Sequence, residues 1–198
     1  MTHQRRTFIS LLAGLLLGPQ ARSQGRLEAA SIIDDLSKPA PRASNGAIWR
    51  VFTDNVMGGV SKATMSRETI AGRSANCLRG DVRLENNGGF VQMSLDLLPD
   101  GTALNASEWT GLEADVFGNN ENYAFNLRTA DLTHPWQSYR HAFIASARWT
   151  TIRFSFHDFK QSRTDLPLDI RQLKRIGVIA IGRPFHADIS IGGIRFIR

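Results

Sequence analysis

The sequence has little cysteine: Cys77 is the only one among 198 residues. One thiol excludes an intramolecular disulfide framework and any zinc cluster built from cysteines. No neighbouring base is present to activate Cys77 as a nucleophile, so a small buried residue is expected there. The five histidines do not pair at metal-ligand spacings, and phosphate-binding, zinc-protease and hydrolase-elbow motifs are absent. Nor does any spacing of oxygen ligands require calcium. The sequence therefore predicts neither catalytic residues, nor a metal site, nor a cofactor.

The sequence also lacks a run of basic residues, although its formal net charge is +6. Cleavage after Ser23 would remove Arg5, Arg6 and Arg22 but no acid, which would leave a charge of +3. The remaining lysines and arginines are spread along the chain. Proteins that bind phosphate backbones gather such residues into a basic stripe. Nucleic acid is therefore not an expected partner.

Long hydrophobic runs are missing as well. The longest run, Phe8–Leu17, would rise about 15 Å as a helix, roughly half the hydrocarbon thickness of a bilayer. Arg5 and Arg6 precede it, and Ala21–Ser23 offers small residues where a signal peptidase cleaves. Residues 1–23 are therefore predicted to be a cleavable signal of the twin-arginine type, with an ordinary secretory signal as the alternative. Either signal predicts export to a bacterial periplasm without a stable membrane anchor.

Apolar residues make up 42% of the chain and charged residues 21%, which is typical of a globular protein. Residues 24–46 are predicted to form a loose lead-in, because a short amphipathic piece is followed by the turn-rich stretch Lys38–Gly46. Residues 47–198 contain no internal repeat and no change in composition. They are therefore predicted to form one domain.

Within that domain, apolar and polar residues alternate in many short segments, as in strands with one buried face. In Tyr123–Arg128, the aromatic and leucine positions are expected to face the core, so Asn126 and Arg128 face away. Further strands are predicted at residues 49–54, 90–96, 112–116, 151–156, 187–191 and 194–197, with a continuously apolar central strand at 176–181. Only residues 169–175 are predicted to be helical. This pattern indicates an all-β, antiparallel sandwich.

Two glycine-rich segments interrupt the strands, DNVMGGVS at residues 54–61 and LENNGGF at residues 84–90. Paired glycines permit positive φ angles and close approach of another chain segment. Asp54 can accept hydrogen bonds from amides that follow it, and Asn-Gly is a strong hairpin signal. Turn chemistry alone accounts for each segment taken separately. The two segments in this order are a more specific signature than either one alone.

In that order the two segments resemble the paired signatures of the complex I intermediate-associated protein 30 family, Asp-x-x-Met-Gly-Gly-x-Ser followed by Asn-Gly-Gly-Phe. The signature positions here are Asp54, Met57, Gly58, Gly59, Ser61, Asn87, Gly88, Gly89 and Phe90. Further matches follow in register within residues 111–129, 136–143, 149–159 and 176–185. The resemblance extends from Trp49 to Ile197, nearly the whole predicted domain.

The resemblance implies a jelly-roll sandwich of the galactose-binding type, similar to a class of carbohydrate-binding modules. It also implies a chaperone-like role in assembling respiratory complex I, without catalytic residues. Mitochondrial members of the family work in the matrix, whereas residues 1–23 predict export. The expected partner is therefore a respiratory or envelope protein complex.

One sheet of a jelly roll has a concave face, and the residues that point out of it line a groove. Asn126 and Arg128 are candidate binding residues there, with Gln137 and Tyr139 from the flanking strand and Trp136 as a stacking plane. Gln92, Ser94 and Trp109 are further candidates, and pairing of Arg128 with Asp115 or Asp131 is the structural alternative. Amides, arginine and aromatic rings suit sugars and protein partners alike.

Three functions remain open from the sequence. The favoured one is a non-enzymatic protein-binding or assembly module, and the second is an exported carbohydrate-binding module. The third is a hydrolase with an unrecognised carboxylate pair, for which Asp54, Asp81, Asp115 and Asp158 are available. A hydrolase of that kind requires two acids about 5 to 9.5 Å apart in one groove.

Overall fold

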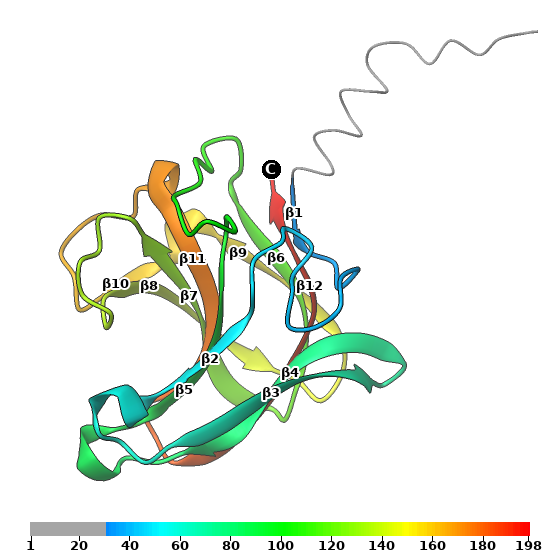
Figure 1. Cartoon of the computed structure of the whole chain (residues 1–198), viewed down its shortest axis with the longest axis vertical. Coiled ribbons are helices and arrows are strands. Elements are labelled where there is room, and N and C mark those ends of the chain that lie inside the picture. Colours follow the sequence, from blue (N-terminus) through cyan, green and yellow to red (C-terminus); the bar gives the residue numbers. More distant parts are fainter. Residues whose placement is uncertain (1–30) are drawn as a thin grey trace, which may run out of the picture. The chain divides into compact units, whose positions relative to one another are not determined.

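Two antiparallel β-sheets account for most of residues 31–198, which are the residues that the computed structural model describes (Figure 1). The predicted signal peptide, residues 1–23, lies outside the described residues, as does the first part of the predicted lead-in, residues 24–30. Within residues 31–198, no helix has the length and hydrophobicity needed to cross a membrane. The prediction of an all-β, antiparallel sandwich is confirmed.

The strands of each sheet come from distant parts of the chain. The first sheet has the order β3 (Lys62–Ile70), β4 (Arg73–Val82), β12 (Phe185–Ile197), β6 (Gly111–Gly118) and β9 (Thr150–Ser155), with β1 (Ile32–Asp34) also paired to β12. The second sheet has the order β10 (Lys160–Ser162), β8 (Ser138–Ala145), β7 (Glu121–Thr129), β11 (Leu173–Ile181), β5 (Phe90–Asp96) and β2 (Arg50–Thr53). Consecutive strands often lie in different sheets, so the connections cross between the layers.

The predicted alternation holds in the second sheet. Phe125 and Leu127 of β7 are buried, and the Phe125 ring lies 4.7 Å from the ring of Phe154 on β9, which joins the two sheets. Asn126 and Arg128 lie on the opposite face, as predicted. The continuously apolar β11 lies between β7 and β5, so its predicted central position is also confirmed (orange in Figure 1).

The helix predicted at residues 169–175 is wrong. Only Ile170–Gln172 form a short 3₁₀ turn, η4, and β11 already begins at Leu173. Asp169 explains the turn, because its carboxylate caps it by accepting a 3.0 Å hydrogen bond from the Arg171 amide. The residues that follow pair with two strands, which outweighs local helix propensity. Similar turns are η1 (Asp54–Met57), η2 (Glu85–Asn87) and η3 (Phe156–Asp158).

Residues 187–191 and 194–197, predicted as two strands, belong to one strand, β12. Its pairing with β6 shifts register between Ile191 and Gly193, as at a β-bulge. A Cβ atom on Gly192 would lie 3.0 Å from the Trp149 ring, so glycine permits this ring to pack on the strand. The glycines interrupt the alternating pattern without ending the strand.

The lead-in is not loose where the structure describes it, and that prediction is corrected. Asp34 of β1 is buried, and its carboxylate accepts hydrogen bonds from the Trp49 indole at 2.8 Å and the Asn76 amide at 3.1 Å. The amides of Leu36 and Ser44 bind the same carboxylate at 3.0 and 3.1 Å. One buried acid therefore ties residues 31–46 to the first sheet.

Replacing Asp34 with Ala should lower the free energy of unfolding by about 3 kcal/mol, because buried donors would lose their acceptor. Urea unfolding followed by tryptophan fluorescence measures this change. The control is Asp165→Ala at an exposed loop position, which should change stability by about 0.5 kcal/mol or less. Equal midpoints for the two variants would show that Asp34 does not tie the lead-in to the sheet.

Candidate functional site

A groove of about 550 Å³ opens on the outward face of the second sheet. Its floor consists of side chains from β2, β5, β7, β8 and β11 that point away from the core. The turns η1 and η2 form the rim near β2, at one edge of the sheet. The connection between β7 and β8, residues 130–137, forms the rim toward the other edge.

Four of the five predicted binding residues line this groove: Asn126, Arg128, Trp136 and Gln137. Trp136 is 45% exposed, and its ring stacks on the His134 ring at 4.7 Å with an interplanar angle of 4°. One ring face is therefore covered by the protein itself. The structure brings these residues together, and their role in binding stays a prediction.

Tyr139 is not in the groove, so its predicted placement there is corrected. Tyr139 is paired with Leu127 across β8 and β7, and both side chains face the core. The tyrosine side chain is 0% exposed, and its hydroxyl donates a 3.1 Å hydrogen bond to the Pro167 carbonyl. The prediction treated Gln137 as a strand residue and therefore placed Tyr139, two residues later, on the same face. Gln137 lies in the loop before β8, so it does not set the alternation of that strand. The β8 residues that reach the groove are Ser138 and Arg140.

Two further candidates also lie elsewhere. Ser94 is buried and does not line the groove. Trp109 stacks on Phe196 with 4.4 Å between ring centroids, and it borders a second cavity of about 650 Å³ together with Tyr139.

Arg128 holds the loop that forms one rim. Its guanidinium donates hydrogen bonds to the carbonyl oxygens of His134 at 2.9 Å and Pro135 at 3.0 Å, and also to Gln137 and Leu132. The alternative partners are engaged elsewhere, because Asp115 pairs with Arg73 at 2.7 Å and Asp131 accepts the Thr129 hydroxyl. Burial, followed by the charge of Arg175, lowers the pKa of Arg128. Arg128 therefore positions the loop that carries Trp136.

The two glycine-rich segments meet at one buried carboxylate, Asp54, which is 0% exposed. One carboxylate oxygen accepts the Ser61 amide at 2.9 Å. The other accepts the Ser61 hydroxyl and the Gly89 amide, both at 2.5 Å, and the Phe90 amide at 3.3 Å. We call this arrangement the Asp54 clasp. It joins residues 54–61 to residues 84–90.

The clasp explains two of the four signature glycines, Gly59 and Gly88. A Cβ atom on Gly59 would lie 2.3 Å from the Asp54 carboxyl carbon, and one on Gly88 would lie 2.5 Å from a carboxylate oxygen. Both positions therefore require glycine, because the carboxylate fills the space of a side chain. The two signature segments are halves of one structural unit.

Two residues inside the first segment take no part in the clasp contacts. Val56 is 73% exposed and Met57 is 50% exposed, and both line the groove from η1. Exposing large apolar side chains brings no stability to the fold. The clasp therefore fixes an apolar rim toward solvent.

Three charged groove residues escaped prediction: Arg140, Arg163 and Arg175. The buried Tyr139 could have revealed Arg140, because adjacent strand residues face opposite sides. Pairing of Arg175 with Arg128 across two strands required the register, which the sequence does not provide. Arg163 follows β10 in a loop, and nothing in the local pattern points to it.

Acidic side chains line neither the groove nor the second cavity within residues 31–198. Both cavities thus lack the carboxylate pair that a glycosidase-type hydrolase requires. The same described residues also contain no group of three or more His, Cys, Asp or Glu side chains that could hold a metal ion.

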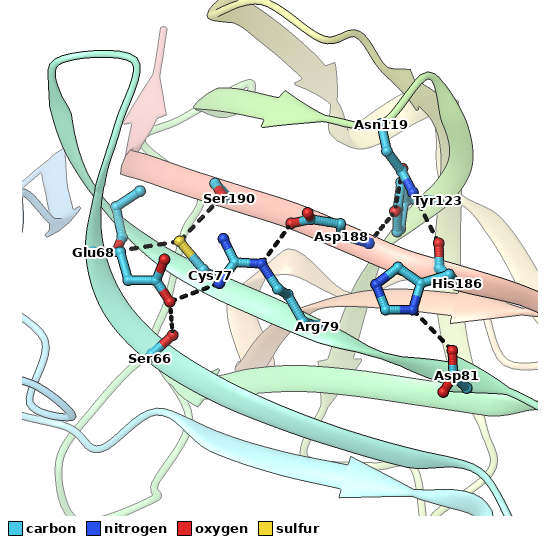
Figure 2. Close-up of polar contacts among 11 residues, drawn as sticks. Ser66, Glu68, Cys77, Arg79, Asp81, Asn119, Tyr123, His186, Asp188 and Ser190 are labelled. Atoms are coloured by element: carbon cyan, nitrogen blue, oxygen red, sulfur yellow. Dashed lines mark hydrogen bonds and ion pairs between the residues drawn. The ribbon is translucent and has the colours of Figure 1, made fainter.

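A separate polar network covers part of the first sheet (Figure 2). Arg79 of β4 bridges Glu68 at 2.6 Å and Asp188 at 3.2 Å, which links β3, β4 and β12. Beside it, Cys77 is fully buried, with the Ser190 hydroxyl 3.1 Å from its sulfur. Burial raises the pKa of the Cys77 thiol, so the thiolate is disfavoured. Cys77 is a buried packing residue, as predicted.

Comparisons with known proteins agree with this architecture. The sequence profile described as Complex I intermediate-associated protein 30 (CIA30) matches residues 37–190. The search of curated proteins finds no match.

Among solved structures, the chain is similar to carbohydrate-binding modules. A family 11 module from Clostridium thermocellum, in complex with a β-1,3-1,4-mixed-linked tetrasaccharide, has a TM-score of 0.62 at 14% identity, covering 84% of this chain and 94% of that one. The family 11 module of the cellulase Lic26A-Cel5E from that organism has a TM-score of 0.64 at 15% identity, covering 84% and 92%. A family 30 module of the cellulase Cel9D-Cel44B, also from that organism, has a TM-score of 0.59 at 12% identity, covering 84% and 95%. These likenesses establish the jelly-roll fold.

Replacing Asp54 with Asn should lower the free energy of unfolding by about 3 kcal/mol. The amide would lose the charge that its donors stabilise, and it would place a donor among other donors. Urea unfolding measures the loss, with Asp165→Asn as the exposed control. A variant as stable as its control would rule out the clasp as a stabilising contact.

The stability difference between the native chain and Asp54→Asn should also depend on pH. Burial raises the pKa of Asp54, but the hydrogen bonds from Ser61, Gly89 and Phe90 outweigh it, so the pKa lies below its ordinary value of 3.8. A depressed pKa stabilises the fold above the unfolded pKa, and this contribution is lost as the pH falls through the folded value. The stability difference between the native chain and Asp54→Asn should therefore narrow below about pH 4. Urea midpoints across this range measure it, and a constant difference would contradict the assignment.

Proposed function

The chain belongs to the Complex I intermediate-associated protein 30 family, and on this premise we propose that it is a non-enzymatic binding module that holds a protein partner during assembly of a respiratory or envelope complex. The observation that carries this proposal is the apolar rim. Val56 and Met57 are held exposed next to the Asp54 clasp, and Trp136 is held exposed by the Arg128-anchored loop.

The composition of the rim supports a protein partner. Aromatic residues, methionine and arginine are enriched where proteins bind one another, and exposed apolar patches mark such surfaces. Fixing the backbone that carries these side chains before binding reduces the entropy that association must overcome. The groove therefore has the properties of a preformed interface.

The proposal of a non-enzymatic role is supported by the groove itself. Within the described residues its lining contains no Asp, Glu, His or Cys, and these are the common general acids, bases and thiol nucleophiles. Its arginines can bind and orient a charged group. The chemistry of the site thus favours recognition over turnover.

We place this activity outside the cytoplasmic membrane, because residues 1–23 are predicted to be an export signal. The partner would then be an envelope complex, or a respiratory complex reached from its periplasmic side.

A second candidate function is carbohydrate binding. It is favoured by the exposed ring of Trp136 in the same groove as the amides of Asn126 and Gln92, because sugars bind to flat rings and hydrogen-bonding amides. The fold is also that of carbohydrate-binding modules, one of which is described in complex with a tetrasaccharide.

Tagged protein expressed in its own cells should co-purify with a defined multi-subunit complex after mild solubilisation of the envelope. Met57→Ala and Trp136→Ala should each weaken this association by about 2 kcal/mol, or about thirtyfold, as expected for anchors of an interface. Quantitative mass spectrometry of the purified material measures the effect.

The matched control is Ile144→Ala, because Ile144 is an apolar residue of similar exposure, 58%, that lies outside the groove. Equal recovery from all variants, or a protein without partners, would contradict the assembly role. Saccharide-dependent tryptophan fluorescence, lost in Trp136→Ala, would establish the second candidate instead.

A further inference from the structure

The charges in the groove are of one sign. Arg128, Arg140, Arg163 and Arg175 line it, and acidic side chains are absent from its lining within residues 31–198. The charge of Arg175 is neutralised by Asp96, whose carboxylate oxygen lies 2.6 Å from the Arg175 Nε atom. Neither Arg140 nor Arg163 forms an ion pair with any described residue. Arg128 also lacks an acidic partner in the described part of the chain, but its guanidinium is occupied by carbonyl oxygens of the loop it holds. Among the described residues, Arg140 and Arg163 are therefore the two groove cations with neither a counter-charge nor a carbonyl partner.

Of these two arginines, Arg140 gives the stronger evidence for an anion-binding site. It is partly buried on β8, and its only side-chain hydrogen bond is a 3.2 Å contact to the Ser138 hydroxyl. Burial, followed by the charge of Arg163, lowers the pKa of Arg140, which means that its cation is held in an unfavourable site. An anion bound between the two guanidinium groups would relieve this cost, and carboxylates match the guanidinium geometry.

The floor beside Arg140 holds an unused acceptor. Asn126 pairs with Arg140 across β7 and β8, and it is only 5% exposed. Its amide nitrogen donates to Gln92 at 3.1 Å, but its carbonyl oxygen Oδ1 is buried without a donor. A buried acceptor without a partner destabilises the site. A ligand that brings an N–H group next to its carboxylate would satisfy it.

The other end of the groove is apolar. Sheet register places Phe90 opposite Ile181 and Phe52 opposite Gln92, while Val56 and Met57 form the rim above them. From Ile181 to Arg175 the floor extends about 20 Å along β11, enough for about six extended residues. The groove therefore offers contact to apolar groups at one end and to an anion at the other.

This combination favours a peptide over a glycan. The apolar end combines the rings of Phe52 and Phe90 with the aliphatic Val56, Met57 and Ile181, a mixture that suits apolar side chains, and one face of Trp136 is already covered by His134. A peptide provides apolar side chains, backbone N–H groups and carboxylates within a few residues.

We infer that the groove binds an extended acidic segment of the protein partner, with apolar side chains against Val56 and Met57 and a carboxylate between Arg140 and Arg163. The inference rests on the proposed function, because it names the chemistry that the partner brings to the same groove.

The test uses defined pools of ten-residue peptides and the purified protein. Each member of the first pool carries two Asp or Glu and three Leu, Phe or Tyr at randomised positions. The second pool has Asn or Gln in place of the acids, and the third has Lys. Bound peptides are identified by mass spectrometry, and the affinity of enriched peptides is measured by titration calorimetry. Enrichment from the acidic pool is expected, with at least tenfold weaker binding of the matched neutral peptides.

Arg140→Gln and Arg163→Gln should each weaken binding of the enriched acidic peptides about tenfold, whereas Arg148→Glu, at an exposed turn outside the groove, should not. Urea midpoints at or above that of the native chain verify that the variants are folded. Raising the salt concentration to about 0.5 M should weaken the acidic peptides alone, which tests the charge without any substitution.

Three results would overturn the inference: no enrichment from any pool, equal binding of acidic and neutral peptides, or binding of oligogalacturonate in place of peptides. These results are distinguishable from failure of the proposed function. In that function's own test, Met57 and Trp136 would still determine co-purification, while a protein carrying both Arg140→Gln and Arg163→Gln would recover the complex in full.

Discussion

The buried carboxylate of Asp54 is the interaction on which the candidate site depends. Removing a charge from water is unfavourable unless several donors replace the solvent, and here Ser61, Gly89 and Phe90 provide them. These donors belong to segments on either side of two strands, β3 and β4. The rim therefore exists only when both segments are in place, so correct folding and a complete groove are achieved together.

Sheet register determines the chemistry of the groove floor. On β7 and β8, Leu127 and Tyr139 face the core as a pair, so their neighbours Asn126 and Arg140 emerge side by side on the other face. One contact therefore decides which polar residues share the floor. A shift of one residue would bury the arginine and expose the tyrosine, so the hydrophobic core maintains the polar arrangement opposite it.

Much of the fold could be predicted from the sequence, because Tyr123–Arg128 and similar segments encode burial through local alternation. The signature glycines were recognisable too, although the reason for Gly59 and Gly88, close contact with Asp54, required the structure. Tyr139 was misplaced because Gln137 lies in a loop and does not set the phase of β8. The burial of Asp34 was also unpredictable, because its donors Trp49 and Asn76 come from distant positions. Long-range partners leave no periodic pattern in a sequence.

The charges near the two ends of the groove have opposite signs. Asp54 lies directly behind Gly88 and Gly89, which line the apolar end, and its hydrogen-bond partners are neutral. Its negative charge is therefore uncompensated at that end, while Arg140 and Arg163 are uncompensated at the other. A carboxylate in the groove is repelled from the clasp and attracted to the arginines, and both effects are strengthened where water is excluded. The carboxylate that stabilises the apolar rim thus also orients an acidic segment along the sheet.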